Sequence, residues 1–270
     1  MENFMNNQDL NSNHNTIPDN KEVFIPGGQS LDGENGIKWI GQAWSLIKNK
    51  LGMWVLLNII YLAIMLGLQM IPLLGLFAGV LAPVFIGGII SVCEKQRTTG
   101  QFELGLLFSG FQKNFTSLLC VGALSFGIII LGVIAVLIVG GSTMVHILLS
   151  SQQGDISAEM LQHSLSTLFL SSFVIFIFYI SALALTWFAP ALIIIHNLKL
   201  GAAMSMSLEA VKKNLLPGFL FFMAIGGIVM ISVVPLGLGL LISMPLFLAS
   251  YYSSYRNIFI GKEKSSTLIG

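Results

Sequence analysis

The sequence predicts an all-α polytopic membrane protein with six transmembrane helices in three hairpins, joined by short interfacial helices on the cytoplasmic side. One observation is the composition: 55% of the residues are apolar and only 9% are charged, whereas a soluble domain carries about 25% charged residues. Another is that the long apolar runs contain no Asp, Glu, Lys or Arg and are long enough for helical crossings of about 20 residues. The predicted spans are about 51–71, 73–93, 115–141, 167–195, 215–234 and 236–255.

The chain divides into a tail, a membrane domain and a second tail. Residues 1–35 are Asn-rich, with six acidic residues and only one basic residue. Such a segment has little apolar surface to bury, so we expect a disordered cytoplasmic tail. Residues 36–260 form the predicted membrane domain, and residues 261–270 a cytoplasmic C-terminal tail.

Prolines and polar stretches mark the predicted turns. Pro72 divides the first uncharged run into two spans, and Pro235 divides the last. Residues 150–166 form a polar connection between the third and fourth spans. The fourth span, 167–195, is long enough to need a tilt or a kink.

The basic residues predict the orientation of the chain. None of them lies in an apolar span, and twelve of the thirteen flank one side of the six spans. Cytoplasmic loops carry an excess of Lys and Arg, so both termini are expected in the cytoplasm. The twelve are Lys38, Lys48, Lys50, Lys95, Arg97, Lys113, Lys199, Lys212, Lys213, Arg256, Lys262 and Lys264.

A short pattern recurs before the first, third and fifth spans. Each begins after a Lys-Asn pair that follows a partly apolar stretch, at 48–49, 113–114 and 213–214. Amphipathic helices of this kind lie in the headgroup layer with Lys towards anionic phosphates. We therefore expect lipid headgroup contacts from Lys48, Lys113, Lys212 and Lys213.

The repeated residues also carry a family resemblance. Trp44, Lys48-Asn49 and Trp54, the second-span proline, and Ser-Tyr-Arg-Asn-Ile-Phe at 254–259 resemble uncharacterised six-span bacterial inner-membrane proteins. They are also similar to the membrane domain attached to some glycerophosphodiester phosphodiesterases. The resemblance covers about residues 37–260 and implies a bacterial cytoplasmic membrane with no established activity. The phosphodiesterase domain lies outside the resemblance, so its chemistry does not carry over.

Small residues and prolines are the candidate site residues. Gly75, Gly79, Pro83 and Gly87 recur every four residues, which stacks them on one helix face where another helix can approach closely. Pro190 and Pro245 occupy similar places in the fourth and sixth spans. The three span prolines favour either helix packing or a groove in which broken hydrogen bonds free carbonyl groups for a ligand.

No residue pattern predicts catalysis, a cofactor or a metal. The sequence lacks HExxH, GxSxG, P-loop and GxGxxG motifs. Asp155, Glu159 and His163 form an outer-loop trio, which the solvation of that loop explains without a metal. A net charge of +1 gives no reason to expect nucleic acid. We therefore expect a protein that is not an enzyme.

Two function classes follow from these observations. The first is a non-catalytic scaffold or envelope-organising component, favoured by the small-residue faces and the absence of intramembrane charge. The alternative is a lipid or small-molecule permease or carrier that uses a groove near the span prolines. Expected partners are membrane lipids and either another membrane protein or further copies of this chain.

Overall fold

The computed structural model describes residues 22–153 and 158–262 and is mostly helical. Five of the described helical stretches are long and apolar enough to cross a membrane, which indicates a membrane-embedded protein. The elements are β1 (Glu22–Phe24), α1 (Asn35–Ile47), η1 (Lys48–Lys50), α2 (Leu51–Gln69), α3 (Pro72–Thr99), η2 (Leu104–Phe108), α4 (Ser109–Gln112), α5 (Phe115–Gln153), α6 (Ala158–Thr186), α7 (Ala189–His196), α8 (Leu200–Lys213), α9 (Leu215–Val233), α10 (Leu240–Phe259) and β2 (Ile260–Lys262).

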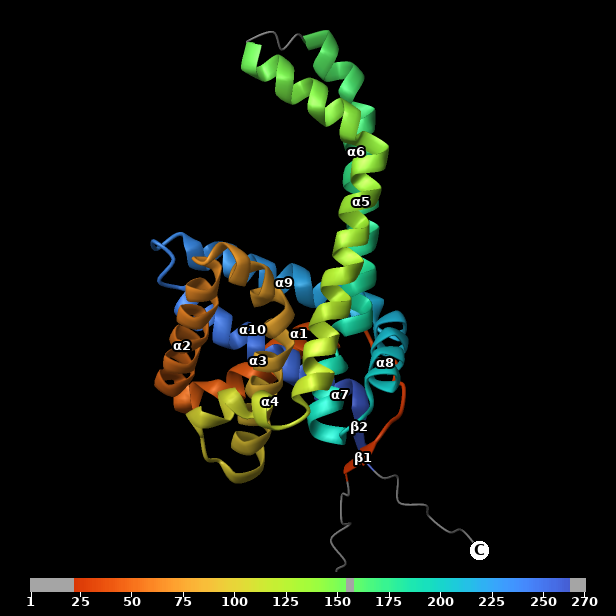
Figure 1. The fold of residues 1–270 in the computed structure, drawn as a ribbon. Coiled ribbons are helices and arrows are strands. Elements are labelled where there is room, and N and C mark those ends of the chain that lie inside the picture. The colour runs from red at the N-terminus through yellow and green to blue at the C-terminus, as the bar shows by residue number, and fades with distance from the viewer. Residues whose placement is uncertain (1–21, 154–157, 263–270) are drawn as a thin grey trace, which may run out of the picture.

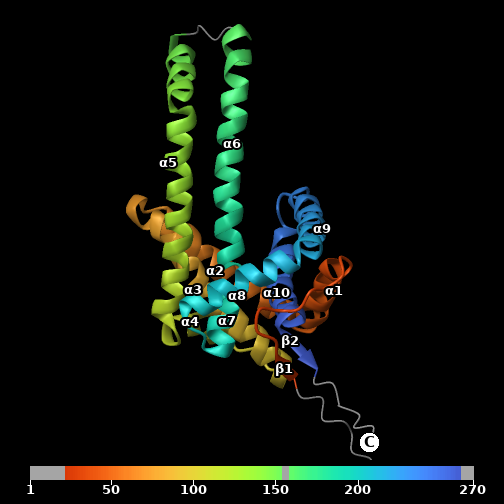
Figure 2. The same ribbon diagram turned by 90° about the vertical axis from the view of Figure 1, so that its right-hand side faces the viewer.

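A long hairpin of α5 and α6 rises from a helical body (Figures 1 and 2). The 39 residues of α5 span about 58 Å at 1.5 Å per residue, and the 19 residues of α2 span about 28 Å. The hairpin therefore reaches well past the turns that join α2 to α3 and α9 to α10. In both views these two turns lie level with the middle of the hairpin.

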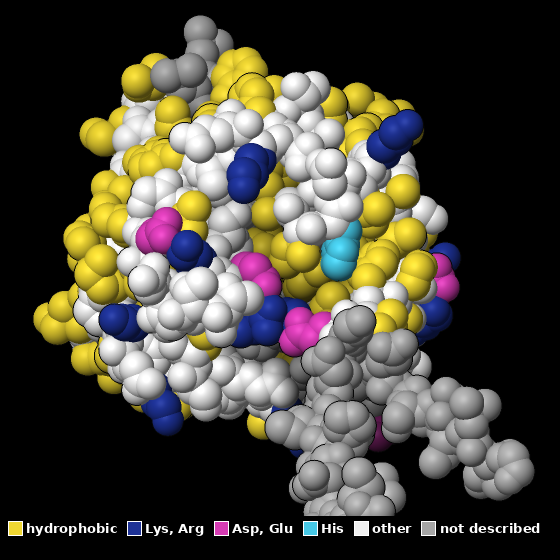
Figure 3. Space-filling model, turned by 90° about the horizontal axis from the view of Figure 1, so that it is seen from below, with side chains coloured by type: hydrophobic (Ala, Val, Ile, Leu, Met, Phe, Trp, Pro, Cys, Tyr) yellow, Lys and Arg dark blue, Asp and Glu magenta, His cyan; other side chains and the backbone are white. Residues whose placement is uncertain are grey.

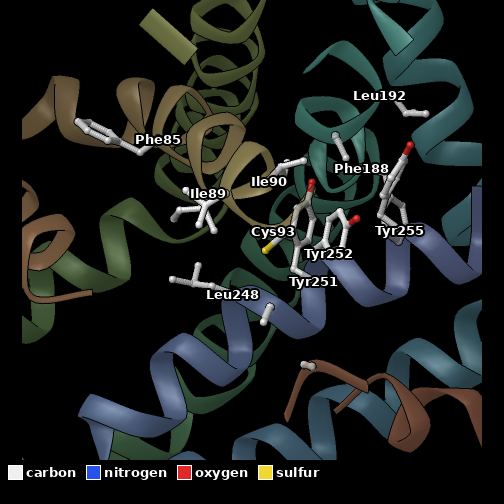
Figure 4. Packing of buried hydrophobic residues seen from close by; sticks show 14 of the residues in the cluster. Phe85, Ile89, Ile90, Cys93, Phe188, Leu192, Leu248, Tyr251, Tyr252 and Tyr255 are labelled. Atoms are coloured by element: carbon white, nitrogen blue, oxygen red, sulfur yellow. The ribbon is translucent and has the colours of Figure 1, made fainter. Parts of the chain in front are cut away.

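The body is organised around α10. Its buried residues include Tyr251, Tyr252 and Tyr255, which lie between Cys93 on α3 and Phe188 and its neighbours on α7 (Figure 4). Because protein surrounds this helix, it tolerates serines and tyrosines that a lipid-facing helix would not. That composition explains why α10, the predicted sixth span, is not among the five most apolar helical stretches.

The chain segment before α1 differs from the predicted disordered tail. Residues 22–24 form β1, which pairs antiparallel with β2, and Phe24 stacks near His196 at 3.8 Å between ring centroids. The backbone of Gln29 donates to Ile258 O, and its side chain donates to Asn257 O. The tail prediction is therefore wrong for residues 22–34, because backbone and side-chain hydrogen bonds offset their low apolar content. Residues 1–21 lie outside the described residues.

The predicted C-terminal tail is likewise shorter than expected. Gly261 and Lys262 belong to β2 and pair with Val23 and Glu22, and residues 263–270 lie outside the described part of the chain. The sheet brings both described ends of the chain to the same side of the molecule (Figure 1).

Helical stretches precede α2, α5 and α9, as the repeat predicts, and α1 and α8 bury part of their surface against protein. On α1, Trp39, Ala43 and Ile47 are buried against the body. On α8, Ala203, Ser207 and Ala210 are buried. These buried residues therefore pack on neighbouring helices, while Trp44 on α1 and Phe108 and Phe111 before α5 stay exposed.

The fourth predicted span is divided into two helices. Helix α6 ends at Thr186, and α7 begins at Ala189 with Pro190 in its first turn. Proline has no backbone N–H and clashes with the preceding turn, so a continuous helix is unfavourable here. The third span, in contrast, extends beyond the predicted residue 141 to Gln153.

Candidate functional site

Charged side chains gather at the end of the molecule that carries the β-sheet (Figure 3). Glu22 pairs with Arg256 and with Arg97, the latter at 3.2 Å. Arg97 also pairs with Glu94 at 2.6 Å, and Lys95 pairs with Glu103 at 3.1 Å. The molecule therefore has a charged end, opposite the tip of the α5–α6 hairpin.

A hydrogen-bond network connects β1, α3 and α10 at this end. The Tyr252 hydroxyl donates to Glu94 Oε2 and accepts from Arg97 Nε at 3.0 Å. Both guanidinium groups, of Arg97 and Arg256, donate to Glu22. Its carboxylates, Glu22 and Glu94, are both paired with arginines. The network fixes the chain segment before α1 to the body.

The pKa of Glu22 gives this attachment a pH dependence. Hydrogen bonds from Arg256 are the main cause that lowers this pKa below its ordinary value of 4.5. A lowered carboxyl pKa stabilises the folded state above the ordinary value, and the stabilisation is lost as the pH falls below it. We expect amide hydrogen exchange at residues 22–28 to be slow at pH 6–7, relative to the intrinsic rate, and to accelerate once the pH falls below 4.5.

The matched variant for this prediction is Glu22→Gln. At pH 6–7 it should already show the fast exchange that the parent shows only at low pH, because a neutral amide keeps the size of the side chain and loses its charge. Equal protection in the variant and the parent at pH 7 would contradict the role of the ion pair.

An apolar cavity of about 240 Å³ lies beside the break between α6 and α7. Helices α1, α8, α9 and α10 complete its walls. The lining residues are Trp39, Ile180, Leu183, Ala184, Trp187, Phe188, Val211, Asn214, Leu215, Gly218, Phe219, Phe221, Phe222 and Ile258.

The Ser207 hydroxyl holds the break open. It accepts a hydrogen bond from Phe188 N at 3.0 Å and donates one to Ala184 O at 3.0 Å. In a continuous helix these two backbone groups would bond each other. The inserted hydroxyl therefore satisfies both groups and leaves Trp187 free to turn towards Phe222 and Tyr251, with ring centroids 5.2 and 5.3 Å away.

The predicted prolines do not form this cavity. Pro190 follows the break, but neither it nor Pro83 nor Pro245 lines the cavity. Pro83 lies half-buried inside α3, and Pro245 is buried inside α10. The cavity is formed by aromatic and aliphatic neighbours of the break.

Among the three glycines of the predicted small-residue face of α3, only Gly87 is in close contact with another helix. A Cβ atom at Gly87 would lie 2.9 Å from Ile194 Cγ1, so α7 approaches closely there. At Gly75 the nearest atom, in Gln69, would be 3.5 Å away, and at Gly79 nothing lies within 4 Å.

The closest backbone approaches involve glycines that the sequence did not single out. A Cβ atom at Gly88 would lie 1.9 Å from Leu107 O, and one at Gly110 would lie 2.1 Å from Val84 O. These two contacts bring the η2–α4 segment against α3. The period-four spacing predicted close packing at the neighbouring Gly87 and not at Gly88. The sequence alone does not show which face of α3 the backbone of another segment will contact.

The four predicted headgroup lysines have different surroundings. Lys213 pairs with Glu209 at 2.8 Å and donates to the carbonyls of Gly28 and Gly27. Lys48, Lys113 and Lys212 are exposed, without an ion pair to any described residue. Lys213 thus holds the segment before α1, and the other three remain candidates for lipid phosphates.

A second groove, of about 650 Å³, opens beside α3 and α7 at the charged end. Lys95, Glu103 and Lys113 are among its walls, and Ile194 and Ile195 supply apolar surface. No group of three or more His, Cys, Asp or Glu side chains in the described ranges could hold a metal ion.

Comparisons with family models, curated proteins and solved structures find no match to this chain. The class that the fold supports is therefore a helical, membrane-embedded protein, defined by its apolar helices alone.

Proposed function

We propose that the protein is a non-catalytic scaffold of a bacterial cytoplasmic membrane, with the charged end in the cytoplasm. The observation that carries this proposal is an exposed aromatic stripe on α6. Phe169, Phe173 and Phe176 are 77%, 53% and 57% exposed, and their spacing of four and three residues places them on one helix face.

The hairpin that carries the stripe has small and polar residues inside and large apolar residues outside. A Cβ atom at Gly140 would lie 2.3 Å from Ser171 Oγ, and Ser171 is buried between the helices. Outward residues include Ile138, which is 80% exposed. Membrane helices associate through such small-residue contacts, so the outer surface suits lipid and the helices of a partner protein.

The polarity of the three turns supports a particular placement in the bilayer. From the last residues of α5 to the residue before α6 the sequence reads SSQQGDIS, which is polar. The other two turns are apolar and exposed, with Met70 at 85% and Leu236 at 97%. We propose that the α5–α6 hairpin crosses the bilayer completely, while the other two hairpins enter from the cytoplasmic side and turn within it.

The backbone of the α9–α10 turn supports this placement. Unpaired backbone groups in hydrocarbon cost several kcal/mol each. Leu236 N donates to Val234 O, Gly237 N to Val233 O and Leu238 N to Pro235 O, at 2.9 to 3.0 Å. Pro235 has no N–H to satisfy. The six complete crossings predicted from the sequence would instead place this apolar turn in water.

Photo-crosslinking in cells tests the scaffold function. A benzophenone amino acid at Phe173 is expected to give one or a few defined protein adducts, because a partner helix would pack on the stripe. The control position is Leu131 on α5, which is also exposed, at 58%, and should give mostly lipid adducts. Lipid adducts alone at both positions would rule out a partner at the stripe.

The carrier function has weaker support. It required a groove beside three span prolines, and none of them lines the cavity at the α6–α7 break. The buried core around α10 is filled by aromatic and aliphatic side chains (Figure 4). We therefore favour the scaffold over the carrier.

A further inference from the structure

The α5–α6 hairpin is longer than a bilayer is thick. Residues 115–141 of α5 cover about 40 Å at 1.5 Å per residue, and a bilayer with its headgroup layers is about 40–45 Å thick. This stretch follows Lys113, a candidate for phosphates of the cytoplasmic headgroup layer. Residues 142–153 therefore begin near the outer headgroup layer and continue α5 for about 18 Å.

The composition of α5 changes at the same place. Every residue from 126 to 141 is apolar or glycine, whereas seven of the twelve residues at 142–153 are Ser, Thr, His or Gln. Polar side chains are costly to place in hydrocarbon and are solvated among headgroups and water. The change indicates that the hydrocarbon ends before residues 142–153, which we name the outer segment of α5.

The outer segment nevertheless exposes four apolar side chains on one face. At 100° per residue they lie within an arc of about 140°, and the exposed Ser142 and His146 lie outside that arc. The four are Met144, Val145, Leu148 and Leu149, which are 37%, 56%, 60% and 51% exposed. The segment is therefore amphipathic, as helices at a membrane surface are.

This apolar face continues the surface that α5 presents to lipid. Leu137, in the apolar part of α5, is 58% exposed, and Met144 and Leu148 follow it by seven and eleven residues. These intervals are close to two and three helical turns, so the three side chains form one stripe along the helix. The continuity favours lipid as the occupant of the face on the outer segment as well.

The hairpin also bends near its tip. Its outer end runs obliquely to the rest in Figure 1, whereas in Figure 2, turned by 90°, the hairpin appears straight. A straight continuation would carry the exposed apolar face into water, which is unfavourable. An oblique one keeps it near the bilayer surface. Leu165, two residues before the Gly140 neighbour Thr167 on α6, is 56% exposed and adds apolar surface there.

We propose that the outer segment lies along the outer leaflet of the bilayer. Met144 and Leu148 occupy the boundary between headgroups and acyl chains, and Ser142 and His146 face water. The partner is a lipid surface held by apolar contact and not by charge, because residues 142–153 contain no Asp, Glu, Lys or Arg. This inference rests on the proposed crossing of the bilayer by the hairpin and does not depend on a partner protein at the α6 stripe.

A fluorophore on an introduced cysteine measures the surroundings of each face. Met144→Cys and Leu148→Cys report on the apolar face, and Ser142→Cys and His146→Cys are the matched controls on the polar side. All four positions are exposed, so the label does not disturb the packing of the hairpin. The parent chain gives the background from Cys93 and Cys120. Each protein is placed in phosphatidylcholine vesicles that contain either a lipid with a nitroxide near the ester end of its acyl chain, or iodide on both sides.

The nitroxide lipid should quench the two apolar-face labels at least about threefold more than the two controls, because an interfacial helix buries its apolar face by about 5–10 Å. Iodide should quench in the reverse order. Vesicles that also contain phosphatidylglycerol should give the same pattern. Nitroxide quenching that appeared only with this anionic lipid would overturn the proposed apolar contact.

Strong iodide quenching at all four positions would overturn the proposal, because the tip would then lie in water. Equal nitroxide quenching at all four would overturn it as well, by placing the tip in hydrocarbon. Protection of the apolar-face labels from both quenchers would show that protein covers the face. Reaction of Ser151→Cys with an impermeant reagent outside intact cells tests the crossing separately, so a failed quenching pattern with that reaction intact refutes this inference alone.

Discussion

Gly88→Ala is expected to be among the most destabilising single substitutions in this protein. The new Cβ would lie 1.9 Å from Leu107 O and 2.9 Å from Leu106 O. Both are backbone atoms of η2, so the clash cannot be relieved by a side-chain rotation. Overpacking of a core costs about 1–3 kcal/mol when side chains can adjust, and we expect more than about 3 kcal/mol here, where the backbone must move.

Gly79→Ala on the same helix is the control for this prediction. Nothing lies within 4 Å of its Cβ position, so replacement of a helical glycine should be neutral or stabilise by about 0.5–1 kcal/mol. Thermal unfolding of both variants in one detergent measures the difference. Equal melting temperatures would mean that α3 and η2 are not in the contact described.

Gln96→Leu is the second substitution with a large expected effect. Gln96 Oε1 accepts from Trp54 Nε1 at 2.9 Å, and its Nε2 donates to Leu46 O at 2.6 Å. The side chain thereby connects α1, α2 and α3. Leucine has a similar size and makes neither bond, so the buried Trp54 Nε1 and the partly buried Leu46 carbonyl both lose this partner, at a cost of about 2–4 kcal/mol.

The control for this substitution is Gln112→Leu. Gln112 is exposed on α4, and surface changes of this kind are usually within about 0.5 kcal/mol. Thermal unfolding with equal losses in the two variants would show that Gln96 does not hold the three helices together.

The positions of most helices could be predicted because apolar runs and charge boundaries determine them. Helices α2 and α9 begin at the predicted first residues, 51 and 215, directly after the charged or polar residues Lys50 and Asn214. Pro72 begins α3, as expected for a residue that fits the first helical turn. These signals are local, so they can be seen without an alignment.

The contacts between distant segments could not be predicted in the same way. The partners of Gln96 are 42 and 50 residues away, and Ser207 completes a helix break 19 and 23 residues before it. Nothing in the local sequence shows where such polar groups will meet. The docked segment at 22–34 was missed for a related reason, because ion pairs and backbone bonds hold it, and apolar content does not reveal them.

The low hydropathy of α10 has a similar cause. A high mean hydropathy is typical of helices that face lipid. Helix α10 instead lies inside the protein and carries Ser250, Ser253 and Ser254 at buried positions. The hydropathy of a helix thus depends on whether lipid or protein surrounds it, as well as on whether the helix lies within the bilayer. The turns of the hairpins are therefore better indicators of where each one ends in the bilayer.

Labelling of introduced cysteines with a membrane-impermeant maleimide tests the proposed placement most directly. Ser151→Cys at the tip of α5 and Leu236→Cys in the α9–α10 turn are both exposed in the fold, and the parent chain gives the background from Cys93 and Cys120. The placement predicts that intact cells label Ser151→Cys and not Leu236→Cys, which should react only after detergent solubilisation. Labelling of both from outside would contradict it and would establish complete crossings by α9 and α10.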